Sequence, residues 1–520
     1  MRVWLVLLLV ACSAPSPRAE FPEASPAIRI LITSSAGDHM REMSATEFAV
    51  PPTAHIQVFA DQPRQVFLGV GGSLTQASAA ALSTLSEEKR KEVLAAYFGA
   101  EGAAYGLSRT HIGSSDFSQY SYSHSPSPDT FSIDEDRRNG LLALIQDARA
   151  SAGADFKLIA SPWTAPPWMK DNNQFFDPVG RRGGRLLKEY YRAYAEYFVN
   201  TIQAYAHEGI PVWAVTPVNE PNGNAGSWES MDMSPEEQRE VVLEISRAFK
   251  AADIESEILI FDQNRAEMAE FTSVILADPS SAPAVLGTAV HWYNSTFRVY
   301  EDVLEAQHAL YPDKLIVQTE GTVDSLAHPL SCAGTCLQEP CGCEELYAWW
   351  KNDAWYWAPV ATDWGWDWAE NREVDHPKYA PAMRYARDLV VGVGHWLSGW
   401  VDWNIVLDKR GGPNHVENYC LAPVLVDDDE VYYTPIYYVL AQFSRHSRPG
   451  AQVLTTVVSG AAGLAATALL NPDGSLAVHV FNESGATVPY RMTLGNDEIE
   501  VEVPDKALQT VIVDGTSRHR

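Results

Sequence analysis

Positively charged residues are scarce in this sequence. It contains 38 lysines and arginines against 67 aspartates and glutamates, which gives a formal net charge of -29 at pH 7. Such an excess of negative charge repels phosphate backbones and anionic bilayers. We therefore expect no nucleic-acid partner, and we expect a neutral ligand to be easier to accommodate than an anionic one.

Long apolar runs are also absent, because no later segment has about 18 uninterrupted apolar residues, the length that a membrane-spanning helix needs. The sequence begins MRVWLVLLLVACSAPSPRAE, in which Arg2 precedes a short apolar run and small residues follow. This pattern predicts a secretory signal over residues 1–20 and an exported protein, either secreted, periplasmic or held at the cell surface. Leu9 to Cys12 resembles a lipobox. Two possibilities stay open: a lipid anchor at Cys12, which would be the only membrane attachment, and ordinary cleavage after Ala14 or Ala19.

Cysteine is rare: the sequence has six, and four of them lie close together at Cys332, Cys336, Cys341 and Cys343. In an exported chain this spacing favours two disulfides within one small loop, and four cysteines allow three pairings. A zinc site of four thiolates is the alternative. Cys420 stands alone and is expected to be a small buried side chain rather than a nucleophile.

Several motifs of catalytic or cofactor-binding sites are missing. The sequence has no G-x-S-x-G elbow, no P-loop, no H-E-x-x-H pair and no Rossmann glycine spacing. His291 could bind a metal, but the expected second and third ligands do not lie near it in the sequence. We therefore expect neither a cofactor nor a metal.

What the sequence does contain is a series of eight short apolar segments, each ending in polar or aromatic residues and most followed by a helical pattern. One helix is predicted to begin at Ser234, with Glu237 completing a capping box, and another to begin at Ser86. Strands and helices alternating in this number predict an α/β fold, a (β/α)8 TIM barrel over residues 64–447, with its site at the carboxyl ends of the strands. The segments are 66–73, 106–117, 156–163, 212–220, 258–264, 285–293, 315–321 and 399–406.

The two ends of the sequence have a different pattern. Over residues 448–516, short alternating strands are separated by turns such as Asn-Pro-Asp-Gly, which predicts a small C-terminal β-sandwich. Strand-like segments at 28–35 and 54–60 have no helical partner, so we expect residues 21–63 to join this sandwich and make it discontinuous. A Cys- and Trp-rich insertion is predicted within the barrel near residues 325–375.

Two carboxylates, Glu220 and Glu320, are predicted at the ends of different barrel strands. If they face each other across a cleft, they can divide the roles of acid and nucleophile, or of acid and base, as glycoside hydrolysis requires. A separation of about 5–5.5 Å would predict retention of configuration, and about 6.5–9.5 Å inversion. The 16 tryptophans favour a sugar ligand, because aromatic faces pack against the C–H bonds of a pyranose.

Longer motifs surround these residues: GVGGSLTQASAAAL (69–82), LIASPWTAPPWMK (158–170), TPVNEP (216–221), HWY (291–293), TEG (319–321) and GWVDWNIVLDKRGGPNHVENYC (399–420). Together they resemble the glucosylceramidase group of glycoside hydrolase family 30. The resemblance covers about residues 66–449 and continues more weakly into the predicted sandwich. It implies a retaining, cofactor-free β-glycosidase, built of a TIM barrel and a β-sandwich, that acts on glucosylceramide or on other neutral β-glucosides and glycans.

By position, the resemblance implies that Glu220 is the general acid/base and Glu320 the nucleophile. Asn219 would bind the sugar 2-hydroxyl, Tyr293 would donate a hydrogen bond to the nucleophile, and Arg109 would neutralise and orient its surroundings. The other predicted substrate-binding residues are Asp116, Trp163, His291, Trp403 and Asn418.

The insertion near residues 325–375 is longer than the corresponding segment of the animal glucosylceramidases. It follows the seventh predicted strand, so we expect it to lie over the aglycone side of the site, which leaves the natural leaving group open. Within the class, a β-1,6-glucanase and a β-xylosidase are the alternatives. From another class, the alternative is a non-catalytic carbohydrate-binding protein on the same fold, which would bind sugars without hydrolysing them.

Overall fold

The computed structural model describes residues 28–43, 51–153, 156–224, 226–324, 349–359 and 376–515. The predicted signal at 1–20 with Cys12, the four clustered cysteines and most of the predicted insertion near 325–375 lie outside these ranges. Within the described ranges, no helix is both long and apolar enough to cross a membrane.

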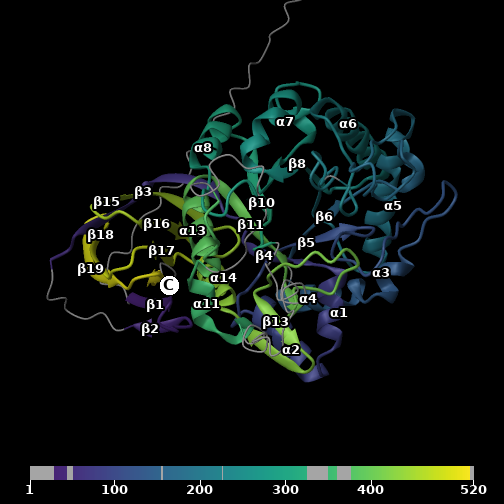
Figure 1. The fold of residues 1–520 in the computed structure, drawn as a ribbon. Helices are drawn as coiled ribbons and strands as arrows, with labels where there is room; N and C mark the ends of the chain where they lie inside the picture. The colour runs from purple at the N-terminus through teal and green to yellow at the C-terminus, as the bar shows by residue number, and fades with distance from the viewer. Residues whose placement is uncertain are drawn as a thin grey trace, which may run out of the picture.

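Eight parallel strands close into a barrel in the order β10-β11-β4-β5-β6-β7-β8-β9 (Figure 1). The (β/α)8 fold class is therefore confirmed, and each of the eight predicted segments contributes one strand. The strands are β4 Val70–Leu74, β5 Leu107–Ile112, β6 Lys157–Pro162, β7 Ala214–Val215, β8 Glu257–Asn264, β9 Gly287–His291, β10 Leu315–Glu320 and β11 Leu397–Asn404.

Helices follow the barrel strands and pack around them. α6 begins as predicted, because the Glu237 amide donates to the Ser234 hydroxyl at 3.3 Å and the Ser234 amide donates to the Glu237 carboxylate at 2.7 Å. Ser86 precedes α2, but its side chain makes no capping hydrogen bond. The helices are α1 Gln76–Ser83, α2 Glu87–Phe98, α3 Asp134–Arg138, α4 Leu141–Ala152, α5 Tyr191–His207, α6 Pro235–Ala252, α7 Met268–Ile275, α8 Glu301–Leu310, α11 Asp353–Trp357, α13 Pro381–Gly394 and α14 Pro435–His446. Short 3-10 turns lie at Pro167–Met169, Lys188–Tyr190, Arg265–Glu267, Ala282–Ala284 and Trp349–Lys351, and a small sheet joins β12 Val406–Asp408, β13 Val424–Asp427 and β14 Glu430–Tyr433.

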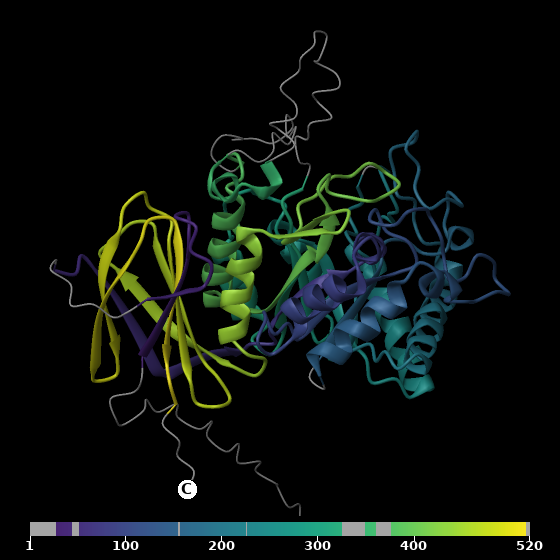
Figure 2. The ribbon, with the colours of Figure 1, turned by 90° about the horizontal axis from the view of Figure 1, so that it is seen from below.

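The second domain is a β-sandwich made from both ends of the described chain (Figure 2). Its nine strands pair in the order β19-β18-β3-β15-β16-β17-β20-β1-β2, so the N-terminal strands lie in the same sheet as the C-terminal ones, as the predicted discontinuous domain requires. A separate apolar core fills this domain. The strands are β1 Ile28–Ser34, β2 Arg41–Met43, β3 Ala54–Val66, β15 Gln452–Ser459, β16 Leu464–Leu470, β17 Leu476–Asn482, β18 Val488–Leu494, β19 Asp497–Val503 and β20 Ala507–Val513.

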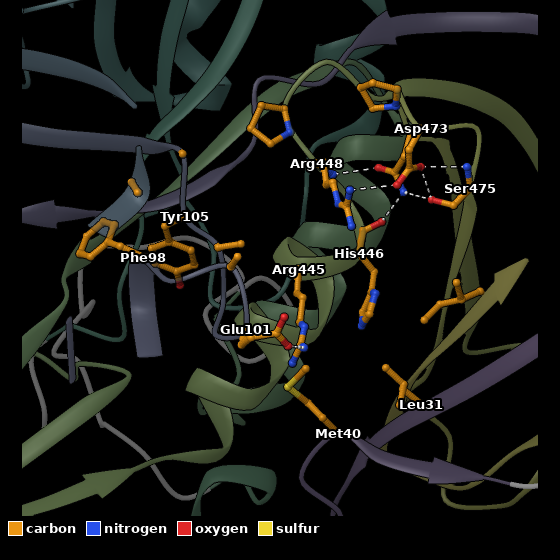
Figure 3. A pocket seen from close by; sticks show the side chains of 18 of the residues that line it. Leu31, Met40, Phe98, Glu101, Tyr105, Arg445, His446, Arg448, Asp473 and Ser475 are labelled. Atoms are coloured by element: carbon orange, nitrogen blue, oxygen red, sulfur yellow. Dashed lines mark hydrogen bonds and ion pairs between the residues drawn. The ribbon is translucent and has the colours of Figure 1, made fainter. Parts of the chain in front are cut away.

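Helices α13 and α14 lie between the barrel and the sandwich and contact both (Figure 2). Gln442 of α14 donates to Thr510 of β20 at 2.9 Å and accepts from Thr33 of β1 at 2.7 Å, which fixes the helix to the sandwich. A cavity of about 1090 Å³ also lies at this junction, lined by residues such as Phe98 and His446 (Figure 3). Part of its lining directly precedes β5, so it lies at the end of the barrel opposite the predicted site.

Candidate active site

The interior of the barrel is built in two layers. Seven strands each supply one apolar side chain to a buried cluster, including Leu107 of β5 and Ala289 of β9. Because side chains alternate along a strand, the residue two positions later faces the same way. Those later positions hold Arg109 and His291, both fully buried. The barrel strands therefore support an apolar lower layer and a polar upper layer toward their carboxyl ends.

Strand β8 departs from this alternation through a bulge. Phe261 and Asp262 have positive φ angles of 76° and 68°, and the pairing of β8 with β9 shifts between Phe261 and Gln263. A bulge re-aims a side chain, and here it turns Asp262 toward the upper layer. Its carboxylate accepts hydrogen bonds from Arg109, Thr216 and Thr319 at 2.6 to 2.7 Å and lies 3.0 Å from a nitrogen of His291.

The same bulge holds the segment that follows β7. The backbone carbonyl of Asp262 accepts a hydrogen bond from the Glu220 amide at 2.9 Å. Glu220 has a φ of 50°, in the left-handed region that residues other than glycine seldom adopt. Strained backbone of this kind is typical of functional sites. The strain and the hydrogen bond together fix where the Glu220 side chain leaves the barrel rim.

Glu220 and Glu320 face each other across the upper layer. One carboxylate oxygen of each, together with one nitrogen of His291, lie within 4.8 Å of one another. The Glu320 side chain is almost buried, and the Glu220 side chain is 18% exposed. At least one oxygen of each carboxylate is therefore within 4.8 Å of the other carboxylate.

Arg109 is the cation that organises the Glu320 side. One of its terminal nitrogens donates to Glu320 Oε2 at 2.5 Å, and the other donates to Asn219 at 2.8 Å and to Asp262 at 2.7 Å. Tyr293 donates its hydroxyl to Glu320 Oε1 at 3.0 Å. Burial raises the pKa of Glu320, while the positive charges of His291 and Arg109 act in the opposite direction. Both oxygens of Glu320 accept hydrogen bonds, which stabilises its charged form.

His291 joins Asp262 to Glu220. Its Nε2 lies 3.0 Å from Asp262 Oδ1, and its Nδ1 lies 3.1 Å from Glu220 Oε1. Burial opposes the charged imidazolium, but the negative charge of Glu320 and the two carboxylate contacts outweigh it and raise the pKa of His291 to about 9. Burial also opposes the charged form of Asp262, yet Arg109 and His291 hold the pKa of that carboxyl well below its usual value.

Aromatic rings cover the Glu320 side of the upper layer. Trp163 and Trp403 are stacked with ring centroids 5.1 Å apart, and the Arg109 guanidinium lies 4.9 Å from the Trp163 ring. Asn418 donates to Asp116 Oδ2 at 2.9 Å. Burial and the nearby charge of Glu320 raise the pKa of the Asp116 carboxyl well above its usual value. These side chains offer an apolar surface and polar groups next to the two glutamates.

Two more acids lie close to the glutamate pair. Asp324, four residues after Glu320, accepts a hydrogen bond from Tyr379 at 3.1 Å, and burial raises its pKa to about 7. Asp402 accepts a hydrogen bond from Tyr385 at 2.6 Å, and burial raises its pKa well above the usual value. Carboxyls that are neutral near pH 7 can donate a hydrogen bond as well as accept one.

Glu220, His291 and Glu320 have the spacing of metal ligands, with one ligand atom each within 4.8 Å of the others. The sequence argument that His291 has no further ligands nearby is therefore wrong, because Glu220 and Glu320 lie next to it in the folded barrel. However, both nitrogens of His291 contact carboxylates, and both oxygens of Glu320 accept hydrogen bonds within the protein. These contacts fit a pair of reacting carboxylates better than a metal centre.

All ten predicted site residues lie at the carboxyl end of the barrel. Asp116 and Asn418 bond to each other near the glutamates, and the other eight are linked by hydrogen bonds or ring contacts, in part through Asp262. Sequence reasoning missed Asp262, whose carboxylate contacts four side chains of the group. The available signal was weak: Asp262 lies in the fifth predicted segment, which ends in polar residues. Cys420 is buried, as expected.

Comparison with known proteins identifies the family. The Glycosyl hydrolase family 30 TIM-barrel domain matches residues 67–331 and 361–447, and the β-sandwich domain of the same family matches residues 450–511. This chain belongs to glycoside hydrolase family 30. The resemblance seen in the sequence motifs is confirmed, and this family 30 chain is a glycoside hydrolase.

The named relatives of this chain fall into more than one type. The chain is 29% identical to lysosomal acid glucosylceramidase of Mus musculus, over 83% of this chain and 78% of that protein. It is 26% identical to endo-1,6-beta-D-glucanase neg1 of Aspergillus fumigatus, over 83% and 81% respectively. The crystal structure of SrfJ from Salmonella typhimurium superposes with a TM-score of 0.77 at 25% identity, covering 94% of this chain and all of that one. Membership of family 30 supports a β-glycosidase. Because the named relatives act on different substrates, family membership alone does not identify the glycan.

Proposed function

We propose that this protein is a retaining β-glucosidase that removes a terminal β-linked glucose through a covalent glycosyl-enzyme. The observation that carries this proposal is the short separation of the glutamate pair, whose nearest ligand atoms lie within 4.8 Å. Retaining glycosidases place their carboxyl groups about 5–5.5 Å apart, whereas inverting enzymes need about 6.5–9.5 Å to admit a water molecule. A nearest-atom distance within 4.8 Å fits the retaining arrangement better than the inverting one.

In the first step, Glu220 donates a proton to the glycosidic oxygen while Glu320 attacks the anomeric carbon. The bond to the aglycone breaks as the ester to Glu320 forms, and the protonated aglycone departs. Arg109 and Tyr293 hold Glu320 in one orientation for attack. Among the described residues, His291 is the side chain hydrogen-bonded to Glu220, and it contacts Oε1, so Oε2 is available to carry the proton.

In the second step, Glu220 has lost its proton and acts as a base. It takes a proton from a water molecule, which attacks the anomeric carbon and releases Glu320 and glucose with the original configuration. Asn219, held by Arg109, is positioned to bind the sugar 2-hydroxyl, where a hydrogen bond strengthens as the transition state forms. Trp163, Trp403 and Asp116 would hold the ring and its hydroxyls.

A terminal glucoside is favoured by the similarity to a protein named glucosylceramidase. The alternative is an endo-acting β-1,6-glucanase, because another relative of similar coverage is named endo-1,6-beta-D-glucanase. Hydrolysis of glucosylceramide, aryl β-glucosides, an aryl β-xyloside and a β-1,6-glucan in one panel separates these substrates. Release of glucose from the glucosides is the expected result, and release of longer fragments from the glucan alone would favour the alternative.

The roles of the two glutamates are tested by matched glycine variants with azide. We expect Glu320→Gly to lower kcat on an aryl β-glucoside by at least about 10⁴-fold, because the attacking atom is removed. Azide should then occupy the space of the carboxylate, attack the substrate directly and give the α-glucosyl azide. Circular dichroism and thermal unfolding should show that the variant is folded.

Glu220→Gly is the matched control. Here the glycosyl-enzyme still forms from substrates with a good leaving group, and azide intercepts it from the opposite face, so the product should be the β-glucosyl azide. If Glu320→Gly gave the β-glucosyl azide and Glu220→Gly the α-glucosyl azide, Glu220 would be the nucleophile and Glu320 the acid/base. Full activity of folded Glu320→Gly would exclude the proposed mechanism.

A further inference from the structure

A buried ion pair lies on one side of the barrel mouth, outside the glutamate pair. His415, in the segment after β12, places Nε2 3.3 Å from Glu229 Oε1, in the segment after β7. The Glu229 side chain is fully buried and the His415 side chain is 16% exposed. We call this pair the His415–Glu229 clasp.

The protonation of His415 follows from its contacts. Its Nδ1 lies 2.8 Å from the backbone carbonyl of Ser118, which can only accept, so this nitrogen carries a hydrogen. Its Nε2 faces the Glu229 carboxylate, and burial of His415 is outweighed by that carboxylate, which raises the pKa of His415. Within the described residues, neither oxygen of Glu229 accepts a hydrogen bond. The charge of His415 therefore compensates for burying Glu229, and the nearby charge of Lys170 adds to it.

The clasp fastens loops that belong to strands far apart in the barrel. Strand β11 is separated from β7 by β4, β5 and β6, so His415 and Glu229 meet only because their loops extend across the mouth. The amide of His415 also donates to the Ser118 carbonyl at 2.9 Å, in the loop after β5. The ring of Phe176, in the loop after β6, lies with its centroid 6.4 Å from His415.

A buried lysine reinforces the same side. Lys170, in the loop after β6, donates to the Ser230 carbonyl at 2.8 Å, next to Glu229, and to the Thr164 hydroxyl at 2.7 Å. It also donates to the carbonyls of Gln174 and Phe175. Lys170 thus fixes the loops after β6 and β7 to each other, independently of the clasp. The clasp in turn joins the loop after β7 to the loop after β12.

Asp116 lies near both the clasp and the catalytic pair. Ser118, whose carbonyl accepts from the amide and lies next to Nδ1 of His415, follows Asp116 by two residues. Asn418, three residues after His415, donates to Asp116 Oδ2 at 2.9 Å. Asp116 is close enough to Glu320, Glu220 and Glu229 to feel the charge of all three. Among the described residues, the other oxygen of Asp116 is buried without a hydrogen-bond partner. A sugar whose anomeric carbon lies between the two glutamates, with a hydroxyl on Asp116, would therefore extend toward the loops that the clasp joins.

We propose that the His415–Glu229 clasp closes the glycone end of the active site, so that the enzyme accepts only a sugar with no substituent beyond its own hydroxyls. This inference rests on the proposed β-glucosidase function and names what restricts it to chain ends. An endo-acting site needs an open path at the same place for the next sugar. The clasp fills that path with a buried salt bridge and four joined loops.

The test compares 4-nitrophenyl β-glucoside with its 4-O-methyl and 6-O-methyl derivatives. The wild-type enzyme should hydrolyse both methylated substrates about 100-fold more slowly, because a methyl group that does not fit costs this much discrimination. In the double variant His415→Ala/Glu229→Ala, which leaves neither charge buried alone, this ratio should fall to below about 10-fold for at least one methylated substrate, while hydrolysis of the parent glucoside continues.

The matched control is His124→Ala/Asp136→Ala, which removes another buried histidine–carboxylate pair, 2.8 Å apart, that does not contact Asp116. It should lose stability without gaining activity on the methylated substrates. Wild-type hydrolysis of both methylated glucosides at nearly the parent rate overturns the clasp proposal, and so does a folded clasp variant with an unchanged ratio. If the clasp variant does not fold, the test is the wild-type ratio of hydrolysis rates between the parent glucoside and its methylated derivatives. Absence of any hydrolysis of the parent glucoside would instead contradict the proposed function.

Discussion

The two layers of the barrel interior use one strand geometry for opposite purposes. On β5 and β9, Leu107 and Ala289 lie in the apolar layer, and two residues later Arg109 and His291 lie in the polar layer. The lower layer needs only shape, because apolar side chains gain stability by leaving water wherever they fit. The upper layer buries several charges, and each buried charge requires a partner at a defined position. On β5 and β9 the interior thus changes from apolar to charged within two residues.

Charge pairing makes the upper layer far less tolerant of change than the lower one. The Asp262 carboxylate contacts four side chains. It links Arg109, on the Glu320 side, with His291, on the Glu220 side. Removing one member leaves others buried and uncompensated, whereas removing a methyl group from the lower layer leaves a small cavity. Substitutions in the two layers should therefore differ in kind as well as in size.

The largest effect should follow from Asp262→Asn. We expect kcat/KM to fall by about 10²–10³-fold, since both glutamates lose part of their positioning. The free energy of unfolding should also fall by about 3 kcal/mol, since Arg109 and His291 lose a buried counter-charge. Steady-state kinetics and urea unfolding measure the two losses.

Thr319→Val is the control for that substitution. It removes one hydrogen bond to Asp262 and leaves every charge in place. We expect a smaller loss of stability, about 1 kcal/mol. An Asp262→Asn enzyme with kcat/KM within twofold of the wild type would show that the upper layer does not depend on this carboxylate.

The bulge that makes Asp262 important also explains why the sequence did not predict it. Regular alternation from Leu259 would turn Phe261 inward, and only the left-handed conformations at Phe261 and Asp262 change that. By contrast, Arg109 and His291 follow regular alternation, and the eight strands follow apolar segments that can be read directly. The clasp residues, His415 and Glu229, lie in loops several residues beyond their strands, where no periodic pattern relates sequence to position.

The next largest effect should be a pH dependence of the unfolding free energy, which arises from His291 in the upper layer. The pKa of His291 is raised to about 9 in the folded protein, against an ordinary value of about 6.5. Its stabilising contribution is therefore complete below about pH 6.5 and is lost as pH rises toward 9, a loss of about 2–3 kcal/mol. The difference in unfolding free energy between the wild type and His291→Gln should shrink over this range. A constant difference from pH 6.5 to 9 would contradict a charged His291.

The smallest effect should come from the lower layer. Val317, on β10, is fully buried in the apolar cluster and lies two residues before Thr319 of the upper layer. Val317→Ala removes methyl groups without exposing a charge, so we expect the unfolding free energy to fall by about 1–2 kcal/mol. Val457, in β15, is 49% exposed, and Val457→Ala should change stability by less than about 0.5 kcal/mol. In both variants kcat/KM per folded molecule should match the wild type. A tenfold loss in Val317→Ala at unchanged fold would mean that small shifts in the apolar layer reach Glu220 and Glu320, and that the two layers are not independent.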